Sequence, residues 1–240
     1  MKRLLLLCLT VLLPIACARG QESCSAEVKV LLVPSEVPRA IESLHAGKAR
    51  SGHVSFFDTN SLDLLSKGII LRVRQGSSSD LTVKVRSTAA DAHEPSSRSG
   101  AKCEFDVVGP ETVRSYSITR KFPGELPESG TGLLPLLSPD QRKMTESLSI
   151  PWNHVKRIAR IQSTTWQIAM PPEFPKLSLE LWEWPTGKIL ELSSRVPVSE
   201  ESSGYEGLQR LIAAHGLSLS AKQSPKTTIA LENIGHRRLH

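Results

Sequence analysis

The sequence predicts an α+β domain in which an antiparallel β-sheet is flanked by a few helices. Several segments alternate apolar and polar residues with a period of two, which is typical of strands with one apolar face. The stretch at residues 184–187, Trp-Pro-Thr-Gly, is a turn that joins two such segments as a hairpin. Three other segments carry the signals that begin or end helices.

Most of the alternating segments can be assigned to strands directly. In the segment at 69–75, for example, Leu71 and Val73 face one way and Arg72 and Arg74 the other. The segments of this kind cover residues 26–33, 69–75, 81–86, 102–107, 177–182 and 190–195. A further strand is expected over 156–166, with its phase left open because Arg157 and Arg160 would fall on opposite faces.

Helices are expected in three places. One covers roughly residues 38–46. Another begins at Ser138, with Gln141 three residues later as in a capping box. A third runs over about 204–215 and is apolar on one side, with Gly216 as its stop. The remaining segments are expected to be a polar loop, a Pro/Gly connector and a loose tail, at 87–100, 123–137 and after 231.

The first 18 residues have the layout of a secretory signal peptide. Lys2 and Arg3 are followed by a mostly apolar run at 4–15 and by the small-residue cleavage site Ala16-Cys17-Ala18. The run is too short to cross a bilayer as a helix, and no transmembrane span is expected in the mature chain. Cleavage after Ala18 predicts a secreted or periplasmic protein with one domain at 19–240. Lipidation of Cys17 is the alternative.

Removal of the signal leaves two of the four cysteines, Cys24 and Cys103. An oxidising compartment allows such a pair to form a disulfide, and two free buried thiols are the alternative. Neither cysteine has a second cysteine or histidine near it at zinc-binding spacing.

The charge balance is mildly basic. The whole chain carries +6, and loss of Lys2 and Arg3 leaves 28 basic against 24 acidic residues, or +4. This balance is compatible with an anionic ligand. No lysine-rich run is present, so specific nucleic-acid binding is not expected. Walker, Gly-x-Ser-x-Gly and His-Glu-x-x-His motifs are also absent from the sequence.

The polar faces of the predicted strands carry charges of both signs. They hold Glu27, Lys29, Arg72, Arg74, Lys84, Arg86, Lys102, Glu104, Asp106, Glu180, Glu191 and Arg195. An open sheet with one solvated face produces this alternation, and the pattern by itself favours that interpretation. A sheet closed into a barrel would instead enclose the charges, which must then pair or meet a ligand. A basic cluster with a few carboxylates suits a polyphosphate bound with a divalent metal.

Five segments resemble the CYTH, or triphosphate tunnel, family. Residues 56–74 are similar to its aromatic-Asp-Thr … Gly … Leu-Arg-x-Arg segment, and Leu81-Thr82-Val83-Lys84 to the strand that follows. Residues 26–29 stand where the opening Glu-x-Glu-x-Lys motif belongs. A later Glu-bearing strand is matched at 187–193 and a closing Ser-Lys segment at 224–231. The resemblance spans about residues 25–232.

This resemblance implies an eight-stranded antiparallel tunnel that binds triphosphate-like substrates with Mg²⁺ or Mn²⁺. The activities it implies include triphosphate hydrolysis and adenylyl cyclisation. The phosphate-binding residues carried over are Lys29, Arg72, Arg74, Lys84, Arg86, Arg160 and Lys226. The expected metal ligands are Glu27, Glu180 and Glu191. The expected partner is therefore a polyphosphate or a small molecule that bears a triphosphate.

The sequence departs from the family pattern at three positions. Ser25 replaces the first Glu of the opening motif, Ser193 stands where a second late carboxylate often lies, and Pro225 interrupts the closing motif. Fewer carboxylates weaken the binding of a hard divalent ion. The leading hypothesis is metal-dependent hydrolysis of an inorganic or organic tri- or polyphosphate. A non-catalytic polyanion-binding module is the alternative, and a purely structural network of charges is the third hypothesis.

Overall fold

The computed structural model describes residues 24–87, 100–122, 124–169, 174 and 176–236. The predicted signal peptide, its cleavage after Ala18 and the lipidation of Cys17 lie outside the described residues. Within the described part of the chain, no helix is both long enough and apolar enough to cross a membrane.

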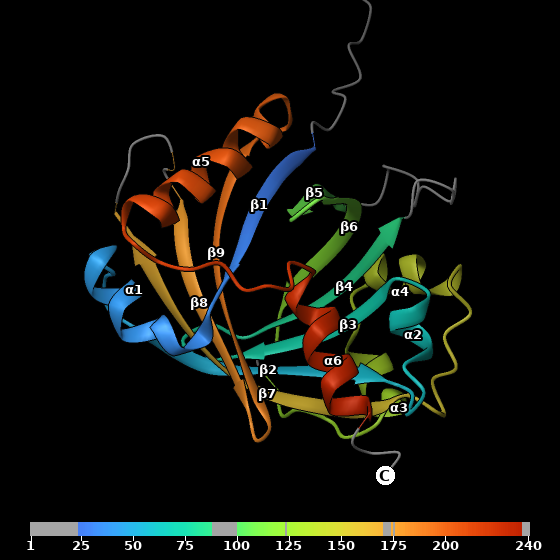
Figure 1. Ribbon diagram of the computed structural model, residues 1–240. Helices are drawn as coiled ribbons and strands as arrows, with labels where there is room; N and C mark the ends of the chain where they lie inside the picture. Colours follow the sequence, from blue (N-terminus) through green and yellow to red (C-terminus); the bar gives the residue numbers. More distant parts are fainter. Residues whose placement is uncertain (1–23, 88–99, 123, 170–173, 175, 237–240) are drawn as a thin grey trace, which may run out of the picture.

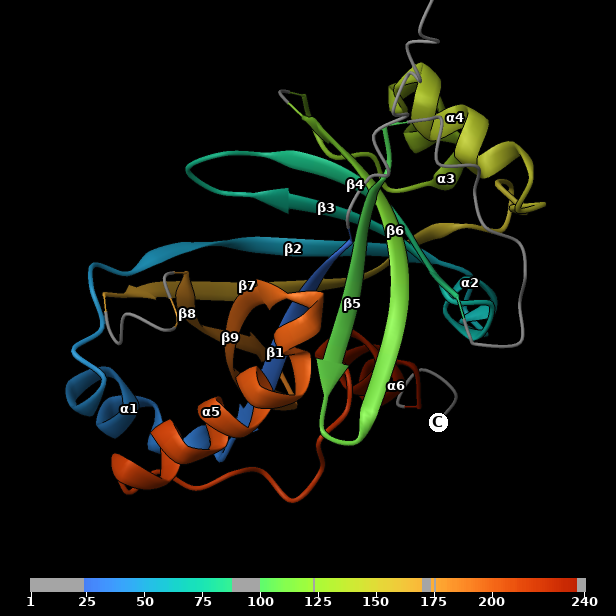
Figure 2. The same cartoon turned by 90° about the horizontal axis from the view of Figure 1, so that it is seen from above.

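The described strands close into a barrel in the order β1-β5-β6-β4-β3-β2-β7-β8-β9 (Figures 1 and 2). Their bounds are β1 Ser25–Leu32, β2 Arg50–Asp58, β3 Ile69–Gln75, β4 Asp80–Ser87, β5 Lys102–Val108, β6 Glu111–Lys121, β7 Lys156–Ile168, β8 Leu177–Trp184 and β9 Gly187–Pro197. The prediction of an α+β barrel is confirmed, but the predicted eight antiparallel strands are wrong in two respects. The described barrel has nine strands, and β1 and β5 pair in parallel.

Helices surround the barrel on two sides and at one end. They are α1 Val37–Ser43, α2 Asp63–Ser66, α3 Gly130–Leu133, α4 Pro139–Glu146, α5 Glu201–Ala214 and α6 Lys226–His236. Short 3-10 turns cover Pro34–Glu36, Leu134–Leu136 and Val198–Glu200. Helices α1, α4 and α5 confirm the three expected ones, and Ser138 and Gln141 form the predicted capping box.

Two predictions about irregular segments need correction. The connector expected at 123–137 contains α3 and a 3-10 turn. Ser129 caps the start of α3 by accepting a hydrogen bond from the backbone N–H of Gly132. The tail expected to be loose after residue 231 is part of α6, which continues to His236. Both segments are held by packing against the barrel, which local sequence signals do not show.

The apolar faces of the strands point outward, beneath the helices. Leu177, Leu179 and Leu181 of β8 pack with Leu208 and Ile212 of α5 in one outer cluster. A second outer cluster lies on the opposite side, where β3, β4 and β6 meet α3 and α4 (Figure 2). The alternating residues of the same strands therefore face the interior. The closed barrel, rather than the open sheet with one solvated face, accounts for the charged alternation.

The interior of the barrel is divided along its length. One section is apolar and contains Leu31, Phe56 and Ile70, packed against Ala230 and Leu231 of α6. The other section contains the charged residues that follow on the same strand faces. On β1, for example, the inward side chains change from Glu27 and Lys29 to Leu31. Helix α6 thus covers the apolar section, and the site lies in the charged section.

A disulfide joins the two strands of the parallel pair. Cys24 precedes β1 and Cys103 lies in β5, and their sulfur atoms are 2.00 Å apart. The pairing follows from the register, because Ser25 stands opposite Glu104 and so places the preceding residues side by side. The bond fixes the edge at which the first strand enters the barrel.

Candidate functional site

The charged section encloses a cavity of about 620 Å³. Side chains from every strand of the described barrel reach its lining, and Lys226 reaches it from α6. The charged residues of this lining are Lys29, Arg50, Arg72, Arg74, Lys84, Arg86, Lys102, Arg195 and Lys226, with Glu27, Asp80, Glu104, Asp106, Glu180 and Glu191. Nine basic against six acidic residues leave an excess of three positive charges. Such an enclosed excess favours an anionic ligand.

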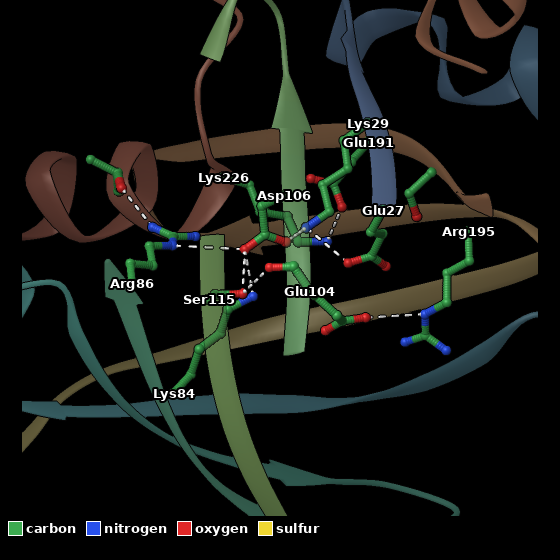
Figure 3. Close-up of polar contacts among 12 residues, drawn as sticks. Glu27, Lys29, Lys84, Arg86, Glu104, Asp106, Ser115, Glu191, Arg195 and Lys226 are labelled. Carbon is green, nitrogen blue, oxygen red and sulfur yellow. Dashed lines mark hydrogen bonds and ion pairs between the residues drawn. The ribbon is translucent and has the colours of Figure 1, made fainter. Parts of the chain in front are cut away.

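Asp106 of β5 is the centre of the largest group of charges (Figure 3). Its carboxylate accepts a hydrogen bond from Nζ of Lys29 at 2.6 Å and another from Nζ of Lys84 at 2.6 Å. Nε of Arg86 lies 4.0 Å from the same carboxylate, and Ser115 Oγ donates to it at 3.3 Å. Burial raises the pKa of Asp106, but the two lysines outweigh it and hold this pKa well below its usual range. Asp106 is thus an anion shared by several cations.

The two lysines on Asp106 are held with different strength. Lys29 also lies 2.9 Å from Glu27, and these carboxylates raise the pKa of Lys29 although burial lowers it. Burial raises the pKa of Glu27, but the attraction of Lys29 prevails and lowers this pKa to about 2. For Lys84, burial lowers the pKa to about 8, since the attraction of Asp106 is opposed by the neighbouring cations Lys29 and Arg86. Lys84 is therefore the surplus cation of the group.

A second group of charges is centred on a cation instead. Lys226, the first residue of α6, donates from Nζ to Oε1 of Glu191 at 2.6 Å and to Oε2 of Glu180. The two glutamates stand directly opposite each other on β8 and β9. Glu180 also accepts hydrogen bonds from Ser163 at 2.7 Å and from the indole N–H of Trp182 at 2.8 Å. Burial raises the pKa of Glu180, but Lys226 and then Arg74 lower it well below its usual range.

The arginines of β3 and β4 are only partly paired within the cavity. Arg72 has only a long contact from Nη2 to Thr82 Oγ1, at 3.4 Å, and its buried Nε finds no acceptor among the described residues. Arg74 forms no salt bridge in the described part of the chain. The Nε of Arg86 is also buried without a hydrogen bond to any described residue, while its Nη1 donates to Thr228 at 3.3 Å. Burial, together with the neighbouring Arg74, lowers the pKa of Arg72 to about 10.

The turn before β3 sets the position of these arginines. Asp58 is buried and accepts backbone hydrogen bonds from Thr59, Leu64 and Leu65, at 2.7, 2.8 and 2.9 Å. The bonds from Leu64 and Leu65 satisfy free N–H groups at the start of α2. The Asp-Thr pair of the sequence motif therefore serves the structure of the turn.

Gly68 closes the same turn in a conformation that side chains rarely adopt. Its φ is +73°, and a Cβ there would lie 2.6 Å from the carbonyl oxygen of Arg86. The backbone N–H of Arg86 in turn donates to the carbonyl of Gly68 at 2.8 Å. This contact fixes β3 against the end of β4, where Arg86 enters the cavity.

Most of the predicted site residues share this one cavity. Lys29, Arg72, Arg74, Lys84, Arg86, Lys226, Glu27, Glu180 and Glu191 all line it. Arg160, predicted to contact phosphate, lies outside this cavity. It is exposed and borders a separate shallow pocket with His53, because Ile161 and Ser163 take the inward positions of β7.

Asp106 and Glu104 are among the charged lining residues whose role the sequence did not reveal. Both lie on the polar face that was predicted for 102–107, but no matched motif assigns them a function. Glu104 is buried, accepts from Lys102 and lies 3.3 Å from Arg195. The alternation of polar and apolar residues could have indicated that both side chains share a face with the other charges. It could not have identified their partners, because most of these come from strands that are distant in the sequence.

The carboxylates predicted as metal ligands do not form a divalent-ion site as they are arranged. No group of three or more His, Cys, Asp or Glu side chains suited to a metal occurs among the described residues. Glu27 is paired with Lys29, and the position between Glu180 and Glu191 is filled by the ammonium group of Lys226. A hard divalent ion prefers several charged oxygens. The donor set therefore does not fit a resident Mg²⁺ or Mn²⁺.

Two solved structures share this fold, and each alignment covers most of this chain and most of the other chain. A protein from Hippeastrum, named as a candidate adenylyl cyclase and described as having a dominant triphosphatase activity, aligns with a TM-score of 0.60 at 16% identity. The alignment covers 85% of this chain and 93% of that one. A candidate adenylate cyclase from Bacillus halodurans aligns with a TM-score of 0.58 at 16% identity, covering 86% and 97%.

At the level of sequence, no family model and no curated protein matches the chain. The similarity to the two structures therefore concerns the course of the backbone, and it agrees with the order of motifs found in the sequence. The fold of this chain is that of the CYTH-type adenylate cyclase and triphosphatase proteins.

Proposed function

We propose that the cavity binds the polyphosphate chain of an inorganic polyphosphate or of a small molecule that bears a triphosphate. The observation that carries this proposal is the set of underused arginine donors. Arg72 and Arg86 have buried Nε–H groups without acceptors among the described residues, and Arg74 lies beside Arg72 without a salt bridge. Leaving a buried charged donor unsatisfied is costly, so this arrangement favours a ligand that supplies acceptors.

A phosphate chain supplies such acceptors. Each phosphoryl group offers several charged oxygens, and guanidinium groups bind them with paired, charge-assisted hydrogen bonds. The excess of three positive charges in the lining would be neutralised by a short phosphate chain. The cavity volume of about 620 Å³ is in the range of ordinary small-molecule sites.

Hydrolysis of the bound chain is the second candidate function. It is favoured by the fold, because the Hippeastrum protein of the same fold is described with a triphosphatase activity. Cations around the transferred group would stabilise the negative charge on its oxygens in the transition state, which is the main work of the protein in phosphoryl transfer. Five of the six carboxylates of the lining pair with a cation, and the sixth, Asp80, accepts a hydrogen bond from Thr82 at 3.1 Å, so the arrangement supports binding more directly than water activation.

Export is part of the proposal. It is supported by the signal-like first 18 residues and by the disulfide between Cys24 and Cys103, since disulfides persist in oxidising compartments. Its test is the N-terminal sequence of the protein recovered from the expressing cells and from their medium. A mature start at Arg19 outside the cytoplasm is expected, and an intact Met1 inside the cell would contradict it.

Titration calorimetry with tripolyphosphate tests binding, and release of phosphate measured in the same samples tests hydrolysis. We expect saturable binding of one tripolyphosphate that weakens as salt is added. Arg74→Met should weaken it by about tenfold or more, because a charge-assisted hydrogen bond is worth about 1.5–3 kcal/mol. Arg210→Met is the matched control, since Arg210 is exposed on α5 and its one partner among the described residues is Glu206. Equal loss in both variants, or no binding at all, would contradict the proposal.

A further inference from the structure

Glu180 and Glu191 form a pair of like charges that a cation must neutralise. The two residues are partners across β8 and β9, and both side chains face the cavity and are largely buried. Like charges directly opposite each other destabilise a sheet, and burial adds to this cost. The cation that bridges them is Lys226, whose Nζ bonds to an oxygen of each carboxylate.

Lys226 is held in this position by more than the two carboxylates. Its Nζ lies 4.7 Å from the centre of the Trp182 ring, and the indole N–H of Trp182 bonds to Glu180. The helix that begins with Lys226 buries Ala230 and Leu231 in the apolar section of the barrel. Packing of α6 therefore delivers the ammonium group, and a tethered cation has a high effective concentration at its site.

The neighbouring positions add no charged oxygen that would help a divalent ion displace Lys226. Ser193 faces Ser178 across β8 and β9 and bonds to it at 3.2 Å, and Ser25 stands at the start of β1. Neither supplies a charged oxygen. Two carboxylates already paired with an ammonium group are a poor site for an ion that prefers six or more oxygen ligands.

We infer that Lys226 takes the place of a divalent metal ion between Glu180 and Glu191, so that the tunnel binds polyphosphate without a metal. The binding half of this inference rests on the proposed function, and the role of Lys226 as the internal cation does not. In the tunnel, Lys226 then neutralises the glutamates. The arginines of β3 and β4 are left to contact the phosphate chain.

The internal cation is tested with Mn²⁺ alone, followed by electron paramagnetic resonance of the free ion. We expect no saturable Mn²⁺ binding by the wild type and one bound ion per chain in Lys226→Met, which frees the two glutamates. The gain should disappear in the double variant Lys226→Met/Glu191→Gln. Lys222→Met is the matched control, because Lys222 is exposed and lies 3.8 Å from Glu232 outside the cavity. Saturable Mn²⁺ binding by the wild type that Glu191→Gln removes would overturn the inference.

A second measurement, on the wild type, tests metal-independent binding even if Lys226→Met does not fold. Tripolyphosphate is titrated in excess EDTA and again with Mg²⁺, after the affinity of Mg²⁺ for tripolyphosphate alone has been measured and subtracted. Dissociation constants within about twofold of each other are expected. Binding that is weaker in EDTA by about tenfold or more overturns the inference. Absence of tripolyphosphate binding under both conditions refutes the proposed function, while the Mn²⁺ result still decides the role of Lys226.

Discussion

The two sides of the tunnel use similar cations in different ways. On one side, Lys29 and Lys226 bond closely to carboxylates of β5, β8 and β9. On the other side, Arg72 and Arg74 of β3 have no carboxylate within salt-bridge distance among the described residues, and an N–H of Arg72 is buried without an acceptor. The comparison distinguishes cations that stabilise the fold through ion pairs from cations that are available to bind a ligand.

Paired and unpaired charges should therefore respond in opposite ways to substitution. Breaking a buried pair leaves its other member unsatisfied, which lowers stability. Removing a buried charge that had no partner relieves its desolvation and costs only the ligand contact. Substitutions on the two sides can test this distinction, because stability and tripolyphosphate affinity are measured separately.

The largest effect is expected at Asp106. Asp106→Ala leaves Lys29 and Lys84 without their shared, buried anion, and removal of one partner from a buried ion pair costs about 3–5 kcal/mol. Urea denaturation should show this loss. Glu128→Gln is the control, because Glu128 is an exposed partner of Arg157 and its loss should cost less than about 1 kcal/mol. Equal losses in the two variants would remove the distinction between buried and exposed pairs.

The disulfide is expected to contribute the next largest amount. Cys24 and Cys103 are 79 residues apart, and cross-links of this kind typically stabilise by about 2–4 kcal/mol, mainly by restricting the unfolded chain. The double variant Cys24→Ser/Cys103→Ser should unfold at correspondingly lower urea. Native protein in which both thiols react freely with a thiol reagent would show that the bond is not formed.

A smaller effect is expected at Arg72, where substitution should weaken ligand binding without lowering stability. Arg72→Met should weaken tripolyphosphate binding by about 10- to 100-fold, since hydrogen bonds to charged groups are worth about 1.5–3 kcal/mol. The free energy of unfolding should stay equal or rise, because burial already lowers the pKa of Arg72 to about 10. A large loss of stability together with the loss of binding would assign Arg72 to the structural charges.

The smallest effect is the pH dependence due to Lys84. Its pKa is lowered to about 8 by burial, against 10.5 for an ordinary lysine, so it loses its proton at lower pH than an ordinary lysine does. Tripolyphosphate affinity should therefore fall as the pH rises from 7 to 9, and the fall should be smaller in Lys84→Met. The folded protein releases this proton at lower pH than the unfolded chain, so the contribution of Lys84 to stability rises with pH between about 8 and 10.5. Equal pH profiles of binding in both proteins would contradict this assignment.

The sequence could predict which side chains share a face but not which face lies inside. Alternation on 69–75 and 81–86 placed Arg72, Arg74, Lys84 and Arg86 together, as the structure does. An open sheet has the same period of two as a closed barrel, so only the resemblance favoured closure. Arg160 was misplaced because the phase of β7 was open in the sequence.

The remaining features depend on contacts between distant segments. The parallel pairing of β1 with β5 is a long-range choice that no local motif shows. The polar β6, with few apolar residues in alternation, was not recognised as a strand. Lys226 was expected to contact phosphate, but α6 brings it to Glu180 and Glu191, which precede it by 46 and 35 residues. Its role follows from the packing of a helix against the barrel, and strand patterns do not show it.

A crystal structure of the protein with tripolyphosphate, grown from a solution containing EDTA, tests most directly whether the phosphate chain binds the arginines of β3 without a metal. We expect phosphoryl oxygens within hydrogen-bond distance of Arg72 and Arg74, with Lys226 still bonded to both Glu180 and Glu191. Tripolyphosphate bound instead at the outer pocket beside Arg160 and His53, or a ligand that draws Lys226 away from the glutamates, would contradict it.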